Sequence, residues 1–216
     1  MRISRAAVVG LLVLAMVTLA SPAASAALDA ACEFAAGKKL VTLKLPADDF
    51  DEGPFLLGRV PGSQRIGFDT DDLPQWKRCS TATTNNTDRI KVVGTQHNES
   101  LIVTIEGGML GPGASREKDG ASEIEISGDL GDGTDTLILV GSNGSDRLAI
   151  HSSSSASFNG DQDADISLSG LNDWRMYGSR GNDVLDGHGA PAIDAYGQEG
   201  DDRVVAHAAR STTPPW

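Results

Sequence analysis

The sequence predicts an all-β protein, a parallel β-roll or β-solenoid with a small disulfide-tied β cap at its N-terminal end. From residue 81 onward, short aliphatic segments alternate with turn-forming stretches, as expected for many short strands joined by turns. Four aspartates recur at intervals of 18 or 19 residues and are expected to line one edge of the solenoid: Asp146, Asp165, Asp183 and Asp202. Glycines number 25, and aromatic residues make up 5% of the chain. This composition suits the thin core of a stacked repeat.

The first 26 residues predict a secretory signal peptide. Arg2 and Arg5 supply the positive end, Ala6–Ala20 the apolar run, and Ala24–Ala26 the small-residue cleavage site. The apolar run is short for a membrane-spanning helix. We therefore expect a secreted, extracellular protein of about 190 residues, with no membrane span once the leader is removed.

The charge balance narrows the class of partner. The chain has 18 basic and 30 acidic residues. Removing Arg2 and Arg5 with the leader leaves 16 basic residues against 30 acidic ones, a net charge near −14. Such acidity argues against nucleic acid and anionic membranes as partners. It favours a cation, whose binding would relieve the repulsion between carboxylates.

The two cysteines predict the N-terminal cap. Cys32 and Cys79 both follow the leader, and an even pair in an exported chain predicts a disulfide. The loop spans 47 positions, which corresponds to about 4 kcal/mol of unfolded-state constraint in the chain-entropy model. We expect residues 27–80 to form a small β cap over the first coil. Its strand-like segments are Leu40–Leu45, Phe55–Val60 and Ile66–Phe68.

Residues 81–206 are predicted to form the solenoid, and residues 207–216 a flexible tail. Gly107–Ala121 contains several glycines and a proline and is expected to be a loop outside the coil. The aliphatic segments expected as strands are Ile90–Val93, Leu101–Ile105, Ile124–Ile126, Leu137–Val140, Leu148–Ile150, Ile166–Leu168, Val184–Leu185 and Val204–Val205.

Three nonapeptides share one pattern: Gly at position 1, Gly at position 4, Asp at position 6 and an aliphatic residue at position 8. They are Gly141–Ala149, Gly178–Asp186 and Gly197–Val205. The glycines permit left-handed backbone angles, so carbonyl oxygens can converge. The aspartate adds a charged oxygen, and calcium prefers six to eight oxygen ligands. One turn cannot supply a full shell, so an ion would lie between stacked turns.

This pattern resembles the calcium-binding nonapeptide of the RTX, or hemolysin-type, repeat family, over roughly residues 128–205. The resemblance implies a secreted bacterial calcium-binding protein in which two nonapeptides form one coil. Stacked turns should then recur about every eighteen residues. The match departs at position 2, where the family favours Gly and this chain has Ser142, Ser179 and Gln198.

Two calcium sites follow from this resemblance. The first lies between the turns Gly178–Asp183 and Gly197–Asp202. Asp183 and Asp202 would supply carboxylates, and the resemblance implies backbone carbonyls near Arg180, Gly181, Glu199 and Gly200. The second is expected where Gly141–Asp146 meets Asp161–Asp165, with ligands among Gly144, Asp146, Asp163 and Asp165.

The opposite edge of the solenoid is less regular. Leu130–Ile138 keeps Gly133, Asp135 and Leu137 of the repeat pattern, but the matching turn at His151–Ser155 lacks carboxylates. We expect this edge to bind calcium weakly or not at all.

Asp161, Asp163 and Asp165 also show the opening spacing of an EF-hand loop. Positions 6 and 12 of that loop would be Ile166 and Asn172, where an EF-hand needs Gly and Glu. The segment is therefore interpreted as an irregular turn of the roll with spare carboxylates.

Two functions remain open. The first is a secreted calcium-binding scaffold or interaction module whose fold is stabilised by external calcium. The second is a calcium-dependent polysaccharide lyase on a parallel β-helix, which needs a basic residue over the carboxylates. The candidates near the repeats are Arg147, Arg175, Arg180 and Arg203. No G-x-S-x-G nucleophile elbow occurs and no other catalytic constellation is found, so we favour the scaffold.

Overall fold

The computed structural model describes residues 31–46, 54–70, 75–116, 122–161 and 163–205. This part of the chain is nearly all β, as predicted: it holds sixteen strands and one 3₁₀ turn at Ala36–Lys38, and no α-helix. The strands form two mixed sheets, which no strand pairing joins within the described residues.

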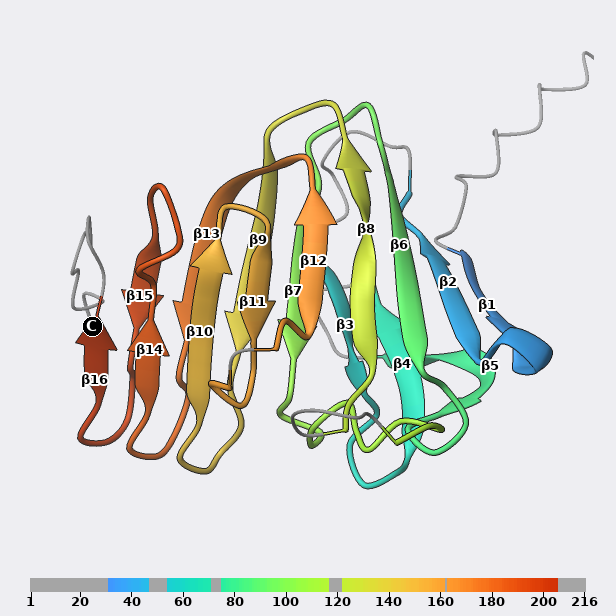
Figure 1. Cartoon of the computed structure of the whole chain (residues 1–216), viewed down its shortest axis with the longest axis horizontal. Coiled ribbons are helices and arrows are strands. Elements are labelled where there is room, and N and C mark those ends of the chain that lie inside the picture. The colour runs from blue at the N-terminus through green and yellow to red at the C-terminus, as the bar shows by residue number, and fades with distance from the viewer. Residues whose placement is uncertain (1–30, 47–53, 71–74, 117–121, 162, 206–216) are drawn as a thin grey trace, which may run out of the picture.

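The first sheet, sheet A, has nine strands. In spatial order they are β1 (Ala31–Ala35), β2 (Leu40–Lys44), β6 (Arg89–Thr95), β8 (Glu125–Gly131), β12 (Ile166–Ser169), β11 (Ser155–Ser157), β10 (Arg147–Ser152), β14 (Val184–Asp186) and β16 (Arg203–Val205). Figure 1 shows them side by side across the molecule, from β1 at one end to β16 at the other.

The second sheet, sheet B, has seven strands. In spatial order they are β15 (Asp194–Tyr196), β13 (Leu171–Tyr177), β9 (Asp135–Val140), β7 (Ser100–Thr104), β3 (Phe55–Arg59), β4 (Arg65–Asp69) and β5 (Lys77–Thr83).

The chain passes repeatedly from sheet A to sheet B and back. After β6 in sheet A comes β7 in sheet B, then β8 in A and β9 in B; β12 to β16 alternate in the same way. Neighbouring strands of this series pair in parallel, for example β6 with β8 and β7 with β9. Two parallel neighbouring strands require a crossover connection between them. In this protein each crossover connection contains the intervening strand of the other sheet.

An antiparallel excursion interrupts this alternation in sheet A. Strand β10 turns back through two residues, Ser153 and Ser154, into β11, and β11 pairs antiparallel with β12. The chain therefore adds three neighbouring strands to sheet A without visiting sheet B. The segment between Ile150 and Ile166 contributes only Ala156 and Phe158 to the buried apolar cluster, too few apolar side chains for a buried strand of sheet B.

The core consists of like side chains stacked from strand to strand. Ile90, Ile126 and Ile166 are paired residues of sheet A, and all three are fully buried. In sheet B, Leu137 pairs with Trp174, which is also buried. Each fully buried aliphatic side chain contributes roughly 1.5–3 kcal/mol of transfer free energy. The stack therefore obtains its stability from repeated contacts between neighbouring strands.

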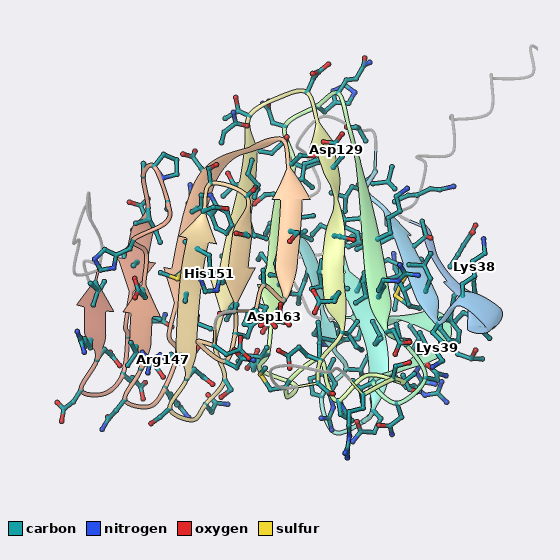
Figure 2. All side chains as sticks on the ribbon, in the orientation of Figure 1. Lys38, Lys39, Asp129, Arg147, His151 and Asp163 are labelled. Carbon is teal, nitrogen blue, oxygen red and sulfur yellow. A yellow bond between two sulfur atoms is a disulfide. The ribbon has the colours of Figure 1, made fainter. Side chains whose placement is uncertain are left out.

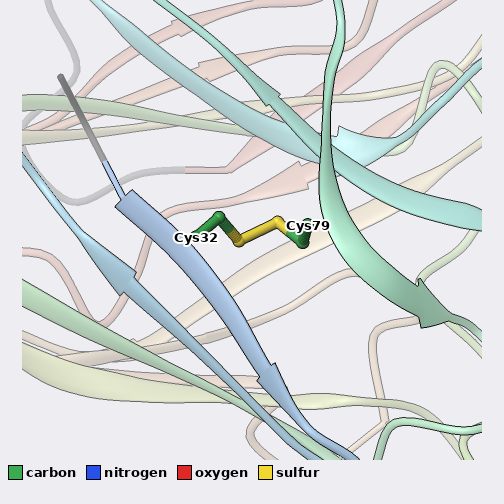
Figure 3. The surroundings of a disulfide bond; sticks show 2 residues. All are labelled: Cys32 and Cys79. Atoms are coloured by element: carbon green, nitrogen blue, oxygen red, sulfur yellow. A yellow bond between two sulfur atoms is a disulfide. The ribbon is translucent and has the colours of Figure 1, made fainter.

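The predicted disulfide is confirmed. Cys32 lies on β1 and Cys79 on β5, with Cα atoms 4.9 Å apart. Figure 3 shows the bond between these two strands. Because β1 is the outermost strand of sheet A and β5 the outermost strand of sheet B, the bond joins the N-terminal edges of the two sheets.

The N-terminal segment also enters both sheets directly. Strand β2 pairs in parallel with β6, and β3 pairs in parallel with β7. The antiparallel pairings that the structure describes at this end are β1 with β2, β3 with β4, and β4 with β5. Residue 80, where the sequence suggested a boundary between cap and solenoid, lies within β5.

All eight aliphatic segments expected as strands after residue 81 lie wholly or partly within strands. The described part of Gly107–Ala121 contains no strand, as predicted. Strands β1, β5, β11, β13 and β15 were not predicted. The leader and the tail at 207–216 lie outside the described residues. Within the described residues, no helix has the length and apolarity needed to cross a membrane.

Candidate metal centre

Three glycine–aspartate turns stack at one edge of the two sheets. They are Gly141–Asp146 before β10, Gly178–Asp183 before β14 and Gly197–Asp202 before β16. The strands that follow them pair in register, because Leu148 lies opposite Leu185 and Leu185 lies opposite Val204. The first and second turns are therefore neighbours in space although their aspartates are 37 residues apart.

This arrangement corrects the predicted row of four aspartates. Asp165 does not lie between Asp146 and Asp183. It precedes β12, and β11 separates β12 from β10. The 19-residue interval from Asp146 to Asp165 spans a hairpin within sheet A, not one full coil. The row at this edge therefore consists of Asp146, Asp183 and Asp202, which we call the aspartate ladder.

Hydrogen bonds join the ladder from turn to turn. The backbone N–H of Asp146 donates to Asp183 Oδ1 at 2.8 Å. The N–H of Asp183 donates in turn to Asp202 Oδ1 at 2.9 Å. The carboxylates of Asp183 and Asp202 thus each accept the backbone N–H of the preceding aspartate in the ladder. Carboxylates form strong hydrogen bonds of this charge-assisted kind, so the aspartates fix the register of the stacked turns.

The glycine at position 1 of the repeated motif is required for a steric reason. A Cβ added to Gly178 would overlap Asp183 Oδ2, and one on Gly197 would overlap Asp202 Oδ2. The aspartate of each turn folds back over its own first glycine. Position 4 needs glycine for a different reason, since Gly181 and Gly200 have φ angles of 122° and 135°, which side chains with a Cβ rarely adopt.

Position 2 of the motif carries unusual backbone angles. Ser179 has φ of 77° and Gln198 has φ of 74°. Both lie in the left-handed region, which costs a residue other than glycine roughly 1–2 kcal/mol. Ser142, at the same position of the first turn, is not among the positive-φ residues. The departure from glycine noted in the sequence therefore places strain at the second and third turns only.

The middle carboxylate of the ladder has an unsatisfied oxygen. Asp183 is 1% exposed, and its Oδ2 has no hydrogen-bond partner. Burial raises the pKa of Asp183, and the charges of Asp146 and Asp202 raise it further, against the lowering effect of the Asp146 N–H. Asp183 lies between two other carboxylates and forms no ion pair with any residue that the structure describes. Such an oxygen suits a hard cation.

The first carboxylate of the ladder is better satisfied. Asp146 Oδ2 accepts the Ser142 N–H at 2.6 Å, and the Ser142 hydroxyl donates to the same carboxylate. Because the Ser142 hydroxyl already hydrogen-bonds to the Asp146 carboxylate, it provides part of the stabilisation that a bound cation would give. The second and third turns have no equivalent bond among the described contacts, so the unsatisfied charge lies there.

The other residues expected at the first site divide into two groups. The side chains of Arg180 and Glu199 are largely exposed and form an ion pair with 3.2 Å between Nε and Oε2. Their backbones form a parallel bridge, and the Gly181 N–H donates to the Glu199 carbonyl at 2.9 Å. The Arg180 side chain is already paired with an acidic side chain. At Arg180, Gly181 and Glu199, therefore, only the backbone carbonyls remain as candidate ligands.

At the expected second site, the acidic residues Asp161, Asp163 and Asp165 lie between β11 and β12, whereas Asp146 precedes β10. Asp165 Oδ2 accepts the Phe158 N–H at 2.6 Å, while Oδ1 is buried without a partner. Burial raises the pKa of Asp165, and the charges of Asp161 and Asp163 raise it further. Figure 2 shows Asp163 near the start of β12 and Arg147 at the start of β10. The acidic loop thus belongs to the antiparallel excursion.

Within the described residues, no group of three or more His, Cys, Asp or Glu side chains is arranged to hold a metal ion. An ion at the aspartate ladder would therefore take most of its ligands from backbone carbonyls, as calcium can. No protein-family model, curated protein or solved structure matched this chain. The candidate site consequently stands on its own geometry.

Sequence reasoning missed a second ladder at the opposite edge. The Glu99 N–H donates to Asp135 Oδ1 at 2.7 Å, and the Asp135 N–H donates to Asn172 Oδ1 at 2.7 Å. The hydrogen-bond pattern is the same as in the aspartate ladder. The spacing of Gly133 and Asp135, which keeps part of the repeat pattern, could have indicated this ladder. Glu99 and Asn172 are not aspartates, so the sequence pattern did not show that they occupy the equivalent positions.

Proposed function

We propose that this chain is a secreted calcium-binding repeat protein of the RTX type, which acts as a scaffold or interaction module. The observation that carries the proposal is Asp183 Oδ2, a buried carboxylate oxygen without a hydrogen-bond partner between two further aspartates. Bound calcium would supply the positive charge that this row lacks.

The residues fit a hard cation in three respects. The ladder offers carboxylates from Asp146, Asp183 and Asp202, and the turns that carry them are stacked in register. Glycines allow the carboxylates to fold over the turns. The acidic excess of the chain, with 30 acidic residues against 18 basic ones, also favours a cation. The site would draw on the turns at Gly178–Asp183 and Gly197–Asp202 first.

The proposed architecture is a parallel β-solenoid. Alternation of strands between sheets A and B and the parallel pairing of successive strands support this interpretation. The excursion through β10, β11 and β12 would widen one face of the solenoid by two strands. Calcium between turns would then stiffen the C-terminal coils, which have the shortest strands.

Protons and calcium should compete for the ladder. The pKa of Asp183 is raised, mainly because the carboxyl group is buried, so the folded state loses stability as this group ionises with rising pH. Calcium would offset that loss, and affinity should fall as the pH falls through the raised pKa. An extracellular site of this type binds at about 10⁻⁴–10⁻³ M. External calcium at ten to a hundred times Kd would stabilise the fold by about 1.4–2.7 kcal/mol.

Calorimetric titration of calcium into Asp183→Asn tests the proposal. Asparagine keeps an acceptor for the Asp146 N–H but removes the charge at the buried oxygen. We expect affinity to fall at least about tenfold, as for strong perturbations of a metal site.

The matched control is Asp194→Asn. Asp194 lies on β15 in the same coil, paired with Arg175 in sheet B and outside the ladder. We expect its calcium affinity to equal that of the parent protein. Equal losses in both variants, or no calcium binding by the parent protein, would contradict the proposal.

A further inference from the structure

A pair of buried carboxyl groups lies at the edge opposite the aspartate ladder. Glu99 follows β6, and Asp135 begins β9 on the next coil. Asp135 is fully buried and Glu99 is 7% exposed. The two groups are in direct contact, because the Glu99 N–H donates to Asp135 Oδ1 at 2.7 Å and their carboxyl groups lie within hydrogen-bond reach of each other.

Each group has one oxygen satisfied and one free. Glu99 Oε1 accepts the Thr95 N–H at 2.9 Å and also the Thr95 hydroxyl. Asp135 Oδ1 accepts the Glu99 N–H. Glu99 Oε2 and Asp135 Oδ2 are buried without any partner. These two oxygens are therefore available for a hydrogen bond between the carboxyl groups.

Two ionised carboxylates cannot share such a site without a counter-charge. Like charges at contact distance in a dry environment repel strongly, and one proton then remains on the pair. Within the described residues, neither Glu99 nor Asp135 forms an ion pair. Calcium needs six to eight oxygen ligands, whereas a single proton can lie between the two free oxygens, which are buried without partners.

We propose that Glu99 and Asp135 share one proton, which forms an O–H···O hydrogen bond between Glu99 Oε2 and Asp135 Oδ2 and clamps two successive coils together. Losing this proton leaves two adjacent negative charges buried in the stack. The clamp therefore holds below neutral pH and is released above it, independently of any cation at the aspartate ladder.

The direction of the pH dependence follows from burial. Desolvation raises the pKa of Glu99 to about 7 from 4.5, assisted by Asp135 and opposed by Thr95. A raised folded-state pKa contributes stability that is complete below pH 4.5 and lost as the pH rises through about 7. The transition belongs to the pair and not to Glu99 alone.

Other ionisable groups lie on the elements around the pair. His97 is half-buried in the same turn, and Asp129, Asp132 and Asp173 are exposed on β8, the next turn and β13. Because His97 lies in the same turn as Glu99, its contribution must be distinguished from that of the clamp by substitution.

The test is urea unfolding between pH 5.5 and 8 with a chelator present. The folding equilibrium constant of the parent protein should fall roughly 10- to 30-fold across this range, as expected for the net release of about one proton. Glu99→Gln, whose amide can donate to Asp135 without titrating, should lose most of this dependence. His97→Gln and Asp132→Asn should retain it.

Infrared spectra give a direct second readout that does not depend on variant stability. The parent protein at pH 6 should show a carboxylic-acid C=O band that weakens by pH 8.5, and the difference spectrum between parent and Glu99→Gln or Asp135→Asn at pH 6 should show the loss of one such carboxyl group. A pH dependence that persists in Glu99→Gln, or that vanishes in His97→Gln, would overturn the proposal. Calcium-dependent stabilisation that Glu99→Gln abolishes would also overturn it, because a cation would then occupy the pair.

Discussion

At the residue scale, the ladder turns show which motif positions are constrained and why. Gly178 and Gly197 are fixed by close approach of their own aspartates, and Gly181 by its φ angle. The sequence could predict that these glycines matter. It could not predict that Ser179 and Gln198 adopt left-handed angles, because their side chains give no sign of it.

Replacing Gln198 with glycine should stabilise the protein. The substitution removes roughly 1–2 kcal/mol of left-handed strain but adds about 0.5–1 kcal/mol of unfolded-state entropy. The net gain is about 0–1.5 kcal/mol, or a rise in Tm of about 3–6 °C at most for a chain of this size. Differential scanning calorimetry measures it.

Ser142→Gly is the matched control for this prediction. Ser142 is not in the left-handed region and holds Asp146 through its hydroxyl. Glycine there relieves no strain and removes a hydrogen bond, so Tm should fall. The same direction of change in both variants would refute the strain argument.

At the element scale, strand positions and strand partners differ in how well they could be predicted. Aliphatic segments such as Ile166–Leu168 identified strands correctly because their side chains are buried. The neighbours of β12 were not predictable. An interval of 19 residues fits either a full coil or a hairpin inside one sheet, and only the weakly apolar stretch before Ile166 distinguishes the two.

The disulfide is the element-scale feature with the largest expected effect on stability. Cys32 and Cys79 close 47 positions of chain and join β1 to β5. Replacing both by alanine should lower the free energy of unfolding by about 4 kcal/mol in the chain-entropy model. Urea titration measures this, with reductant added to the parent protein as a second route to the same state.

The double variant itself should not respond to reductant. A loss well below about 1 kcal/mol in both experiments would mean that strand pairing alone orders the N-terminal edge. In that case the antiparallel contacts of β1 with β2 and of β4 with β5 would suffice to hold the end of the stack.

At the scale of the whole molecule, two ladders run along opposite edges of one stack. The first joins Asp146, Asp183 and Asp202, and the second joins Glu99, Asp135 and Asn172. The same backbone-to-carboxylate hydrogen bond operates in both. We propose that their charges are neutralised differently, by calcium at the first edge and by a shared proton at the second.

A crystal structure determined with calcium present tests the central claim most directly. The account predicts an ion between the turns Gly178–Asp183 and Gly197–Asp202, within about 2.3–2.6 Å of Asp183 Oδ2 and of several backbone carbonyls. Data collected without calcium should lack that peak while the turns keep their register. Saturating calcium with no ion at the ladder, or with ions only at the acidic loop around Asp163, would contradict it.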